Sequence, residues 1–139
     1  MEKNTIYSTK ATASGGRNGK VQTENELLKF ETRLPKEMGG ENNDYTNPEQ
    51  LFACAYATCF DGAIGFAAGL NNYEVTSETT VEIHVDAAEN SSLNLRADVV
   101  ADIQGISRKD AEKLLKHAHS ICPYSKALKP GMEISVKLK

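Results

Sequence analysis

Two cysteines carry the clearest chemical signal in this sequence. Cys59 lies in a long, almost uncharged stretch that runs from Asn47 to Leu70, and Cys122 stands directly before Pro123. A thiol in a dry environment of small residues, with a second thiol available to meet it, indicates two-cysteine redox chemistry. Because a free cysteine has a pKa near ~8.5, such chemistry at neutral pH needs a group that stabilises the thiolate.

A cation is the group that a Cys59 thiolate needs. Cys59 lies about three turns, roughly 15 Å, from the start of its predicted helix, too far to use the positive end of the helix dipole. Arg17, on a glycine-rich turn, is the best candidate because its planar fork can meet a sulfur and a carboxylate together. Glu49 could orient that fork. Taken singly, Arg17 could be a solvated turn residue, Glu49 a favourable charge at a helix start, and Cys59 a buried space filler.

Two other features have plainer interpretations. Cys54 lies in an alanine-rich part of the same helix, and we interpret it as a buried filler. His117 and His119 are two residues apart on a predicted helix, so they point to different faces and lack a second ligand cluster. We therefore expect no metal site.

The N-terminal third of the chain predicts strands. Residues 5–13 are rich in β-formers, the turn sequence 14–19 follows, and residues 20–23 return as the second strand of a hairpin with Arg17 at its tip. A third strand is expected over 27–33, before a polar loop.

Two helices and three further strands follow. Asn47 is a good N-cap, Pro48 fits the first helical position, and Gln50 occupies the position of a capping-box partner. Ser107 begins the second helix and Pro123 forbids its continuation. The expected elements are a helix over 48–69, strands over 75–85 and 93–103, a helix over 108–121 and a strand over 132–138. This order predicts an α+β fold with antiparallel sheet.

The first helix poses a packing problem. It is apolar on every face, and a chain of 139 residues can hardly cover it alone. We therefore expect a homodimer, in which an antiparallel helix pair brings Glu49 of one chain near Cys59 of the other, so that the site is built across the interface. The helix has the length of a membrane span, but its Ala, Gly and Cys content and its lack of flanking cations favour a packed core.

Charge and composition exclude several function classes. The net charge is −3 and the Lys and Arg residues are scattered, which argues against binding to nucleic acid. There is no basic segment followed by an apolar run at the N-terminus, and three cysteines make a poor disulfide framework. We expect a single domain over residues 1–139, located in the cytoplasm, with neither nucleic acid nor membrane as a partner.

Four segments resemble the OsmC/Ohr family, specifically its organic hydroperoxide resistance branch. They are ATASGGRNG (11–19), TNPEQLFA (46–53), YATCF (56–60) and HSICPYSKA (119–127), and they occur in the family's order. The resemblance implies an intertwined α+β homodimer, with two long central helices flanked by antiparallel sheets. It also implies that the N-terminal hairpin, residues 5–33, is exchanged or packed across the dimer. Departures from the family pattern are Cys54, Thr58, Asp61 and the turn 128–131.

The resemblance also implies a reaction. Members are thiol peroxidases for organic and fatty-acyl hydroperoxides, re-reduced by protein-bound dihydrolipoyl groups and needing no cofactor. Cys59 would attack the peroxide and become a sulfenic acid, and Cys122 would resolve it as a Cys59–Cys122 disulfide. Arg17 would hold the thiolate and polarise the peroxide, while Glu49 fixes Arg17. Residues expected to line an apolar substrate pocket are Phe52, Tyr56, Phe60 and Met38.

Three other functions remain open from the sequence. One is a sister peroxidase of the same fold with a broader peroxide preference. Another is a non-catalytic dimer that binds a small molecule and senses redox state through its thiols. A third is a purely structural disulfide between the two cysteines.

Overall fold

The computed structural model of the protein describes residues 3–139. The chain divides into two compact units, Met1–Leu51 and Phe52–Lys139. Helix α1 (Pro48–Leu70) begins in the first unit and continues through the second. The expectation of a single domain over the whole chain stays a prediction.

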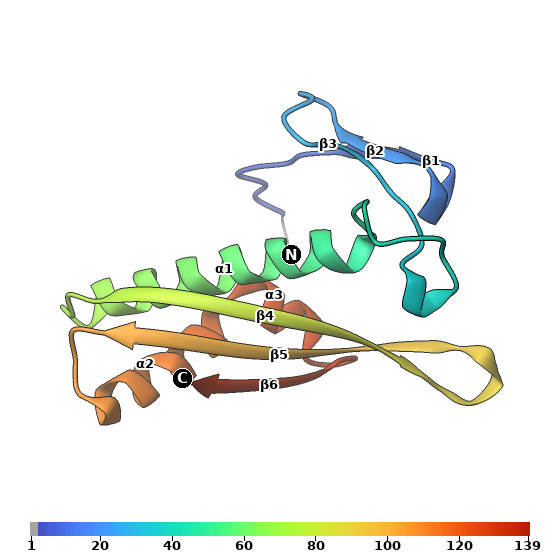
Figure 1. Cartoon of the computed structure of the whole chain (residues 1–139). Coiled ribbons are helices and arrows are strands. Elements are labelled where there is room, and N and C mark those ends of the chain that lie inside the picture. Colours follow the sequence, from blue (N-terminus) through green and yellow to red (C-terminus); the bar gives the residue numbers. More distant parts are fainter. Residues whose placement is uncertain (1–2) are drawn as a thin grey trace. The chain divides into compact units, whose positions relative to one another are not determined.

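The first unit contains a three-stranded antiparallel sheet. Its strands are β1 (Ala11–Ser14), β2 (Lys20–Thr23) and β3 (Lys29–Glu31), in the order β1-β2-β3 (Figure 1). The hairpin expected from the sequence is present, but its first strand begins at Ala11 because the pairing register ends where Ala11 meets Thr23, the last residue of β2. The third strand is likewise shorter than expected.

The turn between β1 and β2 depends on two glycines. Gly15 has φ +79°, a left-handed conformation that is strained for a residue with a side chain. A Cβ on Gly19 would lie 1.8 Å from the carbonyl oxygen of Ser14, so only glycine fits there. The turn therefore holds the backbone around Arg17 in one tight conformation.

Helix α1 starts where the sequence predicts. The Asn47 side chain accepts a hydrogen bond from the Gln50 backbone N–H at 2.9 Å, and Pro48 occupies the first helical position. Gln50 was expected to bond to the backbone N–H of the N-cap residue Asn47, and this expectation is wrong. Its side-chain oxygen accepts from the Thr46 hydroxyl at 3.0 Å, because that hydroxyl lies one turn earlier and reaches it first.

The second unit is built on a three-stranded sheet with a long hairpin (Figure 1). Strands β4 (Thr76–Ala87) and β5 (Leu93–Gln104) pair antiparallel over their full length, as expected. Strand β6 (Glu133–Leu138) pairs parallel to β5, so the expectation of an antiparallel closing strand is wrong. The helices between β5 and β6 are the reason, because they carry the chain back to the end of the sheet where β5 began.

Those connecting helices are α2 (Arg108–Ile121) and α3 (Pro123–Leu128). Ser107 caps α2 by accepting from the Asp110 backbone N–H at 3.1 Å, as the sequence predicts. Pro123 ends α2 as expected, but it also opens α3, which the sequence did not predict. Proline suits the first position of a helix because that position needs no N–H donor.

One hydrophobic core joins α1, α2 and the sheet within the second unit. Alternate residues of β5 point into it, and one face of each helix covers them. The buried apolar side chains are Tyr56, Phe60, Ala63, Ile64, Ala67, Ala68, Ala97, Val99, Ala101, Ile103, Ala111, Leu114, Leu115, Ala118 and Cys122. Helix α1 is long and apolar enough to cross a membrane by length and composition alone, a test that a core helix also passes.

The opposite face of α1 is exposed in the protomer. Phe66 is 65% exposed and Leu70 60% exposed, and the exposed positions between Cys54 and Leu70 carry no charge. The predicted homodimer, in which a second copy of the chain packs against this helix, stays a prediction.

Candidate thiol site and its family

The second unit brings Cys59 and Cys122 together. Their sulfur atoms lie 3.7 Å apart, within S–H···S contact, although the residues are 63 positions apart in the chain. Cys122 is fully buried and Cys59 is partly exposed. The partly exposed Cys59 thiol therefore lies next to the buried Cys122 thiol, and both are reduced.

Cys122 stands at a corner between two helices. Its backbone N–H donates to the Ala118 carbonyl at 2.8 Å and closes α2, while its own carbonyl accepts from the Lys126 N–H at 3.0 Å and opens α3. Because both helix ends bond to this one residue, the Cys122 side chain has a defined direction.

Electrostatics within the second unit do not activate Cys59. Burial raises the pKa of the Cys59 thiol, the Tyr124 backbone N–H lowers it, and the neighbouring Cys122 raises it further. The net direction is upward. A thiolate at this position therefore needs a cation that stabilises it, as the sequence predicts.

An aromatic cluster lies beside Cys59, whose sulfur is hydrogen-bonded to the Tyr124 backbone N–H. Tyr56 lies at the centre of three neighbouring rings, with ring centroids 6.2 Å from Phe52, 6.3 Å from Phe60 and 5.9 Å from Tyr124. Tyr56 and Phe60 are fully buried, whereas Phe52 and Tyr124 reach the surface. Three of the four predicted pocket residues are thus together, and Tyr124 joins them unpredicted.

Arg17 and Glu49 form a bidentate ion pair in the first unit. Arg17 Nη1 donates to Glu49 Oε2 at 2.8 Å, and Nη2 donates to Oε1 at 2.6 Å. This pairing lowers the pKa of Glu49, chiefly through the hydrogen bonds from the guanidinium. A carboxylate that is ionised at neutral pH holds the Arg17 fork in one plane.

Thr32 holds the turn that carries Arg17 in place, a role that no pattern in the sequence indicates. Its hydroxyl donates to the Gly16 carbonyl at 3.1 Å and accepts from the Gly19 N–H at 3.3 Å. Asn18 adds a second link, because its side-chain oxygen accepts from the Leu34 N–H at 3.1 Å. The two contacts fasten the turn to the segment after β3.

Comparison with known proteins places the chain in a family. The sequence profile of the OsmC-like protein family matches residues 40–137. The organic hydroperoxide resistance protein-like 2 of Staphylococcus epidermidis is 38% identical over 138 residues, which cover 96% of this chain and 95% of that protein. The chain belongs to the OsmC/Ohr family.

Solved structures of the Ohr branch have the same fold. An organic hydroperoxide resistance protein from Legionella pneumophila, also described as a predicted redox protein, matches with a TM-score of 0.93 at 37% identity, covering 98% of this chain and 99% of that one. One from Vibrio cholerae, with captopril bound in one of its active sites, matches with a TM-score of 0.91 at 38% identity, covering 97% and 93%. The α+β architecture with two sheets is therefore that of the Ohr proteins.

Two further residues singled out in the sequence are Cys54 and Met38. Cys54 is exposed, not buried as expected, because it lies on the α1 face that points away from the core of the second unit. Met38 belongs to the first unit, where it ends the short turn Lys36–Met38. Its role in a substrate pocket stays a prediction.

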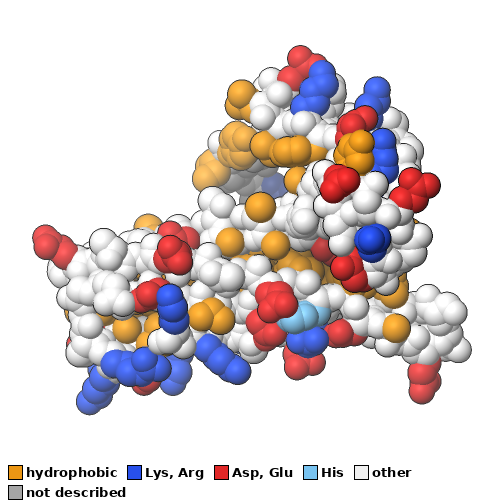
Figure 2. All heavy atoms as spheres, in the orientation of Figure 1, with side chains coloured by type: hydrophobic (Ala, Val, Ile, Leu, Met, Phe, Trp, Pro, Cys, Tyr) orange, Lys and Arg blue, Asp and Glu red, His pale blue; other side chains and the backbone are white. Residues whose placement is uncertain are grey.

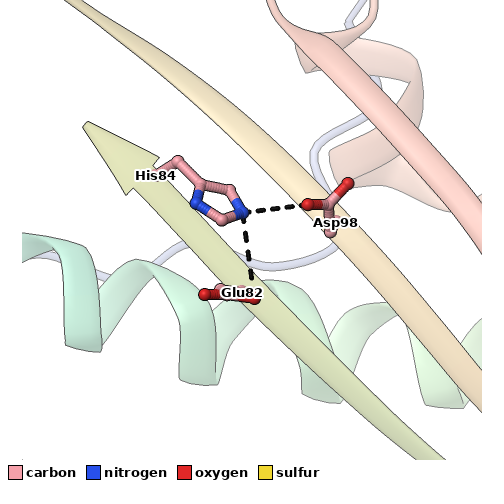
Figure 3. Close-up of side chains that lie close together, drawn as sticks. All are labelled: Glu82, His84 and Asp98. Carbon is pink, nitrogen blue, oxygen red and sulfur yellow. Dashed lines mark hydrogen bonds and ion pairs between the residues drawn. The ribbon is translucent and has the colours of Figure 1, made fainter. Parts of the chain in front are cut away.

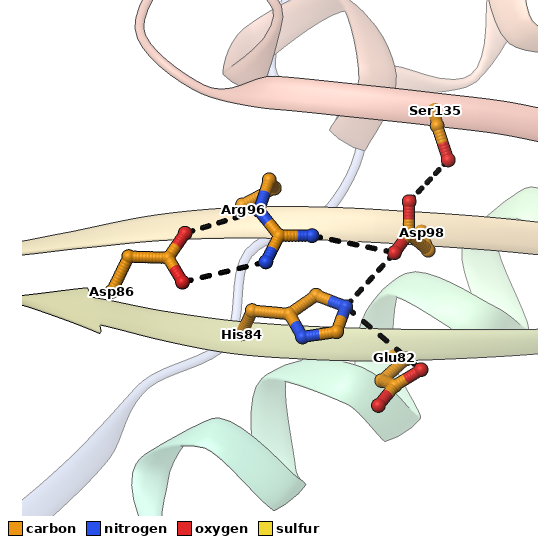
Figure 4. A network of polar contacts seen from close by, with 6 residues as sticks. All are labelled: Glu82, His84, Asp86, Arg96, Asp98 and Ser135. Atoms are coloured by element: carbon orange, nitrogen blue, oxygen red, sulfur yellow. Dashed lines mark hydrogen bonds and ion pairs between the residues drawn. The ribbon is translucent and has the colours of Figure 1, made fainter.

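The outward face of the second unit's sheet carries a cluster of ionisable side chains (Figure 2). Ligand atoms of Glu82, His84 and Asp98 lie within 4.8 Å of one another, close enough to be considered for a metal ion (Figure 3). His84 Nε2 is 2.9 Å from one Asp98 oxygen and Arg96 lies 3.5 Å from the same oxygen, while the Ser135 hydroxyl donates to the other (Figure 4). Protein donors thus occupy both oxygens, and we interpret the cluster as a network that ties the three strands together.

Proposed function

We propose that the protein is a thiol-dependent peroxidase that reduces organic hydroperoxides to alcohols. The observation that carries this proposal is the 3.7 Å separation of the Cys59 and Cys122 sulfurs in a member of the Ohr branch. The relatives are named for resistance to organic hydroperoxides, and resistance of that kind follows from chemical removal of the peroxide.

The reaction proceeds in three balanced steps. The Cys59 thiolate attacks the outer peroxide oxygen, the O–O bond breaks, and the alkoxide takes a proton and leaves as an alcohol, with Cys59 as a sulfenic acid. The Cys122 thiol attacks that sulfur, and the S–O oxygen leaves as water. A dithiol then reduces the Cys59–Cys122 disulfide, for which we propose a lipoyl-bearing protein. The two thiols supply both electrons, so the proposal includes no metal and no other cofactor.

We assign the activation of Cys59 to Arg17. The guanidinium stabilises the thiolate and polarises the peroxide, and Glu49 keeps it oriented through the two hydrogen bonds described above. In the proposed homodimer, Arg17 of one protomer serves Cys59 of its partner. Mixing inactive Arg17→Ala and Cys59→Ser proteins tests this arrangement, because heterodimers then regain one intact site, whereas no recovery contradicts it.

The aromatic cluster supports an organic substrate. Phe52 and Tyr124 present apolar surface beside the thiols, which favours a hydroperoxide with a hydrocarbon tail over hydrogen peroxide. The captopril bound in an active site of the Vibrio cholerae relative shows that such a site in that protein accepts a small organic molecule. We propose that the protein acts in the cytoplasm, where reductants return its thiols to the reduced state.

A steady-state peroxidase assay tests the proposed function. Cumene hydroperoxide and dihydrolipoamide are supplied to the wild type, Cys59→Ser and Cys54→Ser. We expect turnover by the wild type and Cys54→Ser, loss of turnover in Cys59→Ser, and slower turnover with hydrogen peroxide. Equal rates with both peroxides indicate the broader sister peroxidase, while oxidation of the thiols without turnover indicates a redox sensor. Activity that survives Cys59→Ser refutes the proposal.

A further inference from the structure

Three polar side chains form a chain of hydrogen bonds beside the thiol pair. The Tyr56 hydroxyl of α1 lies 2.8 Å from Ser125 Oγ of α3, and the same Oγ lies 3.0 Å from His119 Nδ1 of α2. Tyr56 and Ser125 are fully buried and His119 is partly buried. Donation from Tyr56 to Ser125 and from Ser125 to His119 Nδ1 satisfies all three groups, and the reverse direction also makes both hydrogen bonds.

These side chains lie one turn before Cys59 and on both sides of Cys122. Tyr56 lies three residues before Cys59, about one helical turn away on α1. His119 lies three residues before Cys122 and Ser125 three residues after it, so their hydrogen bond spans the corner between α2 and α3. The chain of hydrogen bonds therefore ties the turn that precedes Cys59 to both sides of the corner that carries Cys122.

His119 is suited to act as an uncharged imidazole in this chain of hydrogen bonds. Burial lowers the pKa of His119, and the charge of Lys129 lowers it further. Its ring also packs against Phe60, with centroids 6.2 Å apart. A neutral imidazole fixed by a ring contact accepts or donates one hydrogen bond at Nδ1, as the chain requires.

We propose that Tyr56, Ser125 and His119 are positioning residues for the resolving step, holding the corner so that Cys122 attacks oxidised Cys59. The inference rests on the proposed function, because the step is the second of the three given above. In that step the S–S bond forms, the S–O bond of the Cys59 sulfenic acid breaks, and the hydroxyl leaves as water with the proton from Cys122. Cys122 is oxidised and the sulfenic sulfur is reduced.

The distance between the sulfurs shows why positioning matters here. The 3.7 Å separation must close to about 2.05 Å in a disulfide, so the sulfurs approach by roughly 1.7 Å. A misplacement of about 1 Å in a reacting pair can slow a step by about 100-fold. Because the corner is hydrogen-bonded to α1 through Ser125, Cys122 can move in fewer directions. Motion of its sulfur toward the Cys59 sulfur is among those that remain.

Single substitutions remove one or both links of this chain of hydrogen bonds. Tyr56→Phe removes only the hydroxyl and keeps the ring, and Ser125→Ala removes both links. His119→Ala removes the last link, whereas His119→Asn keeps a polar atom near the place of Nδ1. Matched controls are Tyr73→Phe, which removes a hydroxyl from a half-buried ring of the same core, and Ser120→Ala, which removes an exposed hydroxyl that donates to the His117 carbonyl.

Rapid-quench mass spectrometry after one equivalent of cumene hydroperoxide separates the two steps. Dimedone traps the sulfenic acid, and alkylation of free thiols reports the disulfide. In Tyr56→Phe, Ser125→Ala and His119→Ala we expect disulfide formation to slow by about ten- to 100-fold relative to sulfenic acid formation. Excess peroxide should then convert more Cys59 to sulfinic acid. His119→Asn should recover much of the rate, and both controls should match the wild type.

The outcomes distinguish this inference from the function on which it rests. If the wild type forms the disulfide and Tyr56→Phe forms it equally fast, the positioning role is refuted and the peroxidase proposal stands. Equal slowing of both steps, with a lowered unfolding temperature, also refutes it, because that is the mark of a general structural role. If the wild type forms no disulfide, the proposed function itself fails. Should Ser125→Ala not fold, Tyr56→Phe decides the question alone.

Discussion

Replacing Arg17 by alanine tests whether its guanidinium stabilises the Cys59 thiolate. Burial within the second unit raises the pKa of Cys59, and the Tyr124 N–H opposes it only in part. A positive charge within about 4–6 Å lowers the pKa of an acidic group by about 1–3 units. We therefore expect Arg17→Ala to raise the pKa of Cys59.

That shift has a calculable effect on reactivity. For a thiol that titrates above neutrality, each tenfold rise in basicity lowers the thiolate fraction at pH 7 by about tenfold. The more basic thiolate is then intrinsically about threefold more nucleophilic, since the Brønsted slope for thiolates is about 0.4–0.5. The rate at which Cys59 reacts with an alkylating agent at pH 7 should therefore fall, by about threefold for each tenfold rise in basicity.

Glu49→Gln should give an intermediate result. An amide can accept only one of the two hydrogen bonds that Arg17 donates at 2.6 and 2.8 Å. A hydrogen bond to a charged group contributes about 1.5–3 kcal/mol, and the 36% exposure of the Arg17 side chain reduces this to about 1 kcal/mol. Loss of about 1 kcal/mol corresponds to about a fivefold drop in the oriented population.

Site-resolved alkylation with iodoacetamide, followed by peptide mass spectrometry between pH 5 and 10, measures these effects. A matched control is Lys10→Ala, which removes an exposed cation of the same unit from its ion pair with Glu24. We expect its profile to overlay the wild type. An Arg17→Ala profile that also overlays the wild type refutes the assignment of Arg17, whatever its effect on turnover.

Three further predictions concern stability. Hydrogen bonds from Ser135 and His84 lower the pKa of Asp98 in the folded protein. The ionised carboxylate therefore stabilises the fold above its unfolded pKa of about 3.9, and this contribution is lost as the pH falls through the lower folded pKa. The urea midpoint of the wild type should accordingly drop below about pH 4, and that of Asp98→Asn should drop less. Asp61→Ala should cost about 1–3 kcal/mol in urea unfolding, because two hydroxyls donate to Asp61 at 2.8 Å and lose their acceptor; an unchanged midpoint contradicts this. Gly19→Ala should lower the unfolding temperature clearly while Gly131→Ala, with open space around it, should not; equal effects contradict the turn geometry.

Much of the fold could be predicted because local signals agree with it. Asn47 and Ser107 start helices at the expected residues, and the alternating pattern predicts the β4–β5 hairpin. The parallel pairing of β6 could not be predicted, because it depends on how far α2 and α3 carry the chain. Pro123 illustrates the ambiguity directly, since proline ends one helix and begins the next.

The candidate site was predictable in its residue types more than in its contacts. Cys59 and Cys122 stand out from the sequence, and so does a cation on a glycine turn. Thr32 and Ser125 do not, because a single hydroxyl has no periodic signature and acquires its role only when distant segments meet. Cys54 was expected to be buried and is exposed, because an alanine-rich helix does not reveal which of its faces lies in the core.

The most direct test of the account is to map the thiols after a single oxidation. The reduced protein receives one equivalent of cumene hydroperoxide, free thiols are alkylated, and the digested peptides are identified by mass spectrometry. We expect one equivalent of alcohol and a disulfide that joins Cys59 to Cys122, with Cys54 still free. Reduced Cys59 after the peroxide has been consumed, or a disulfide that involves Cys54 in its place, would contradict it.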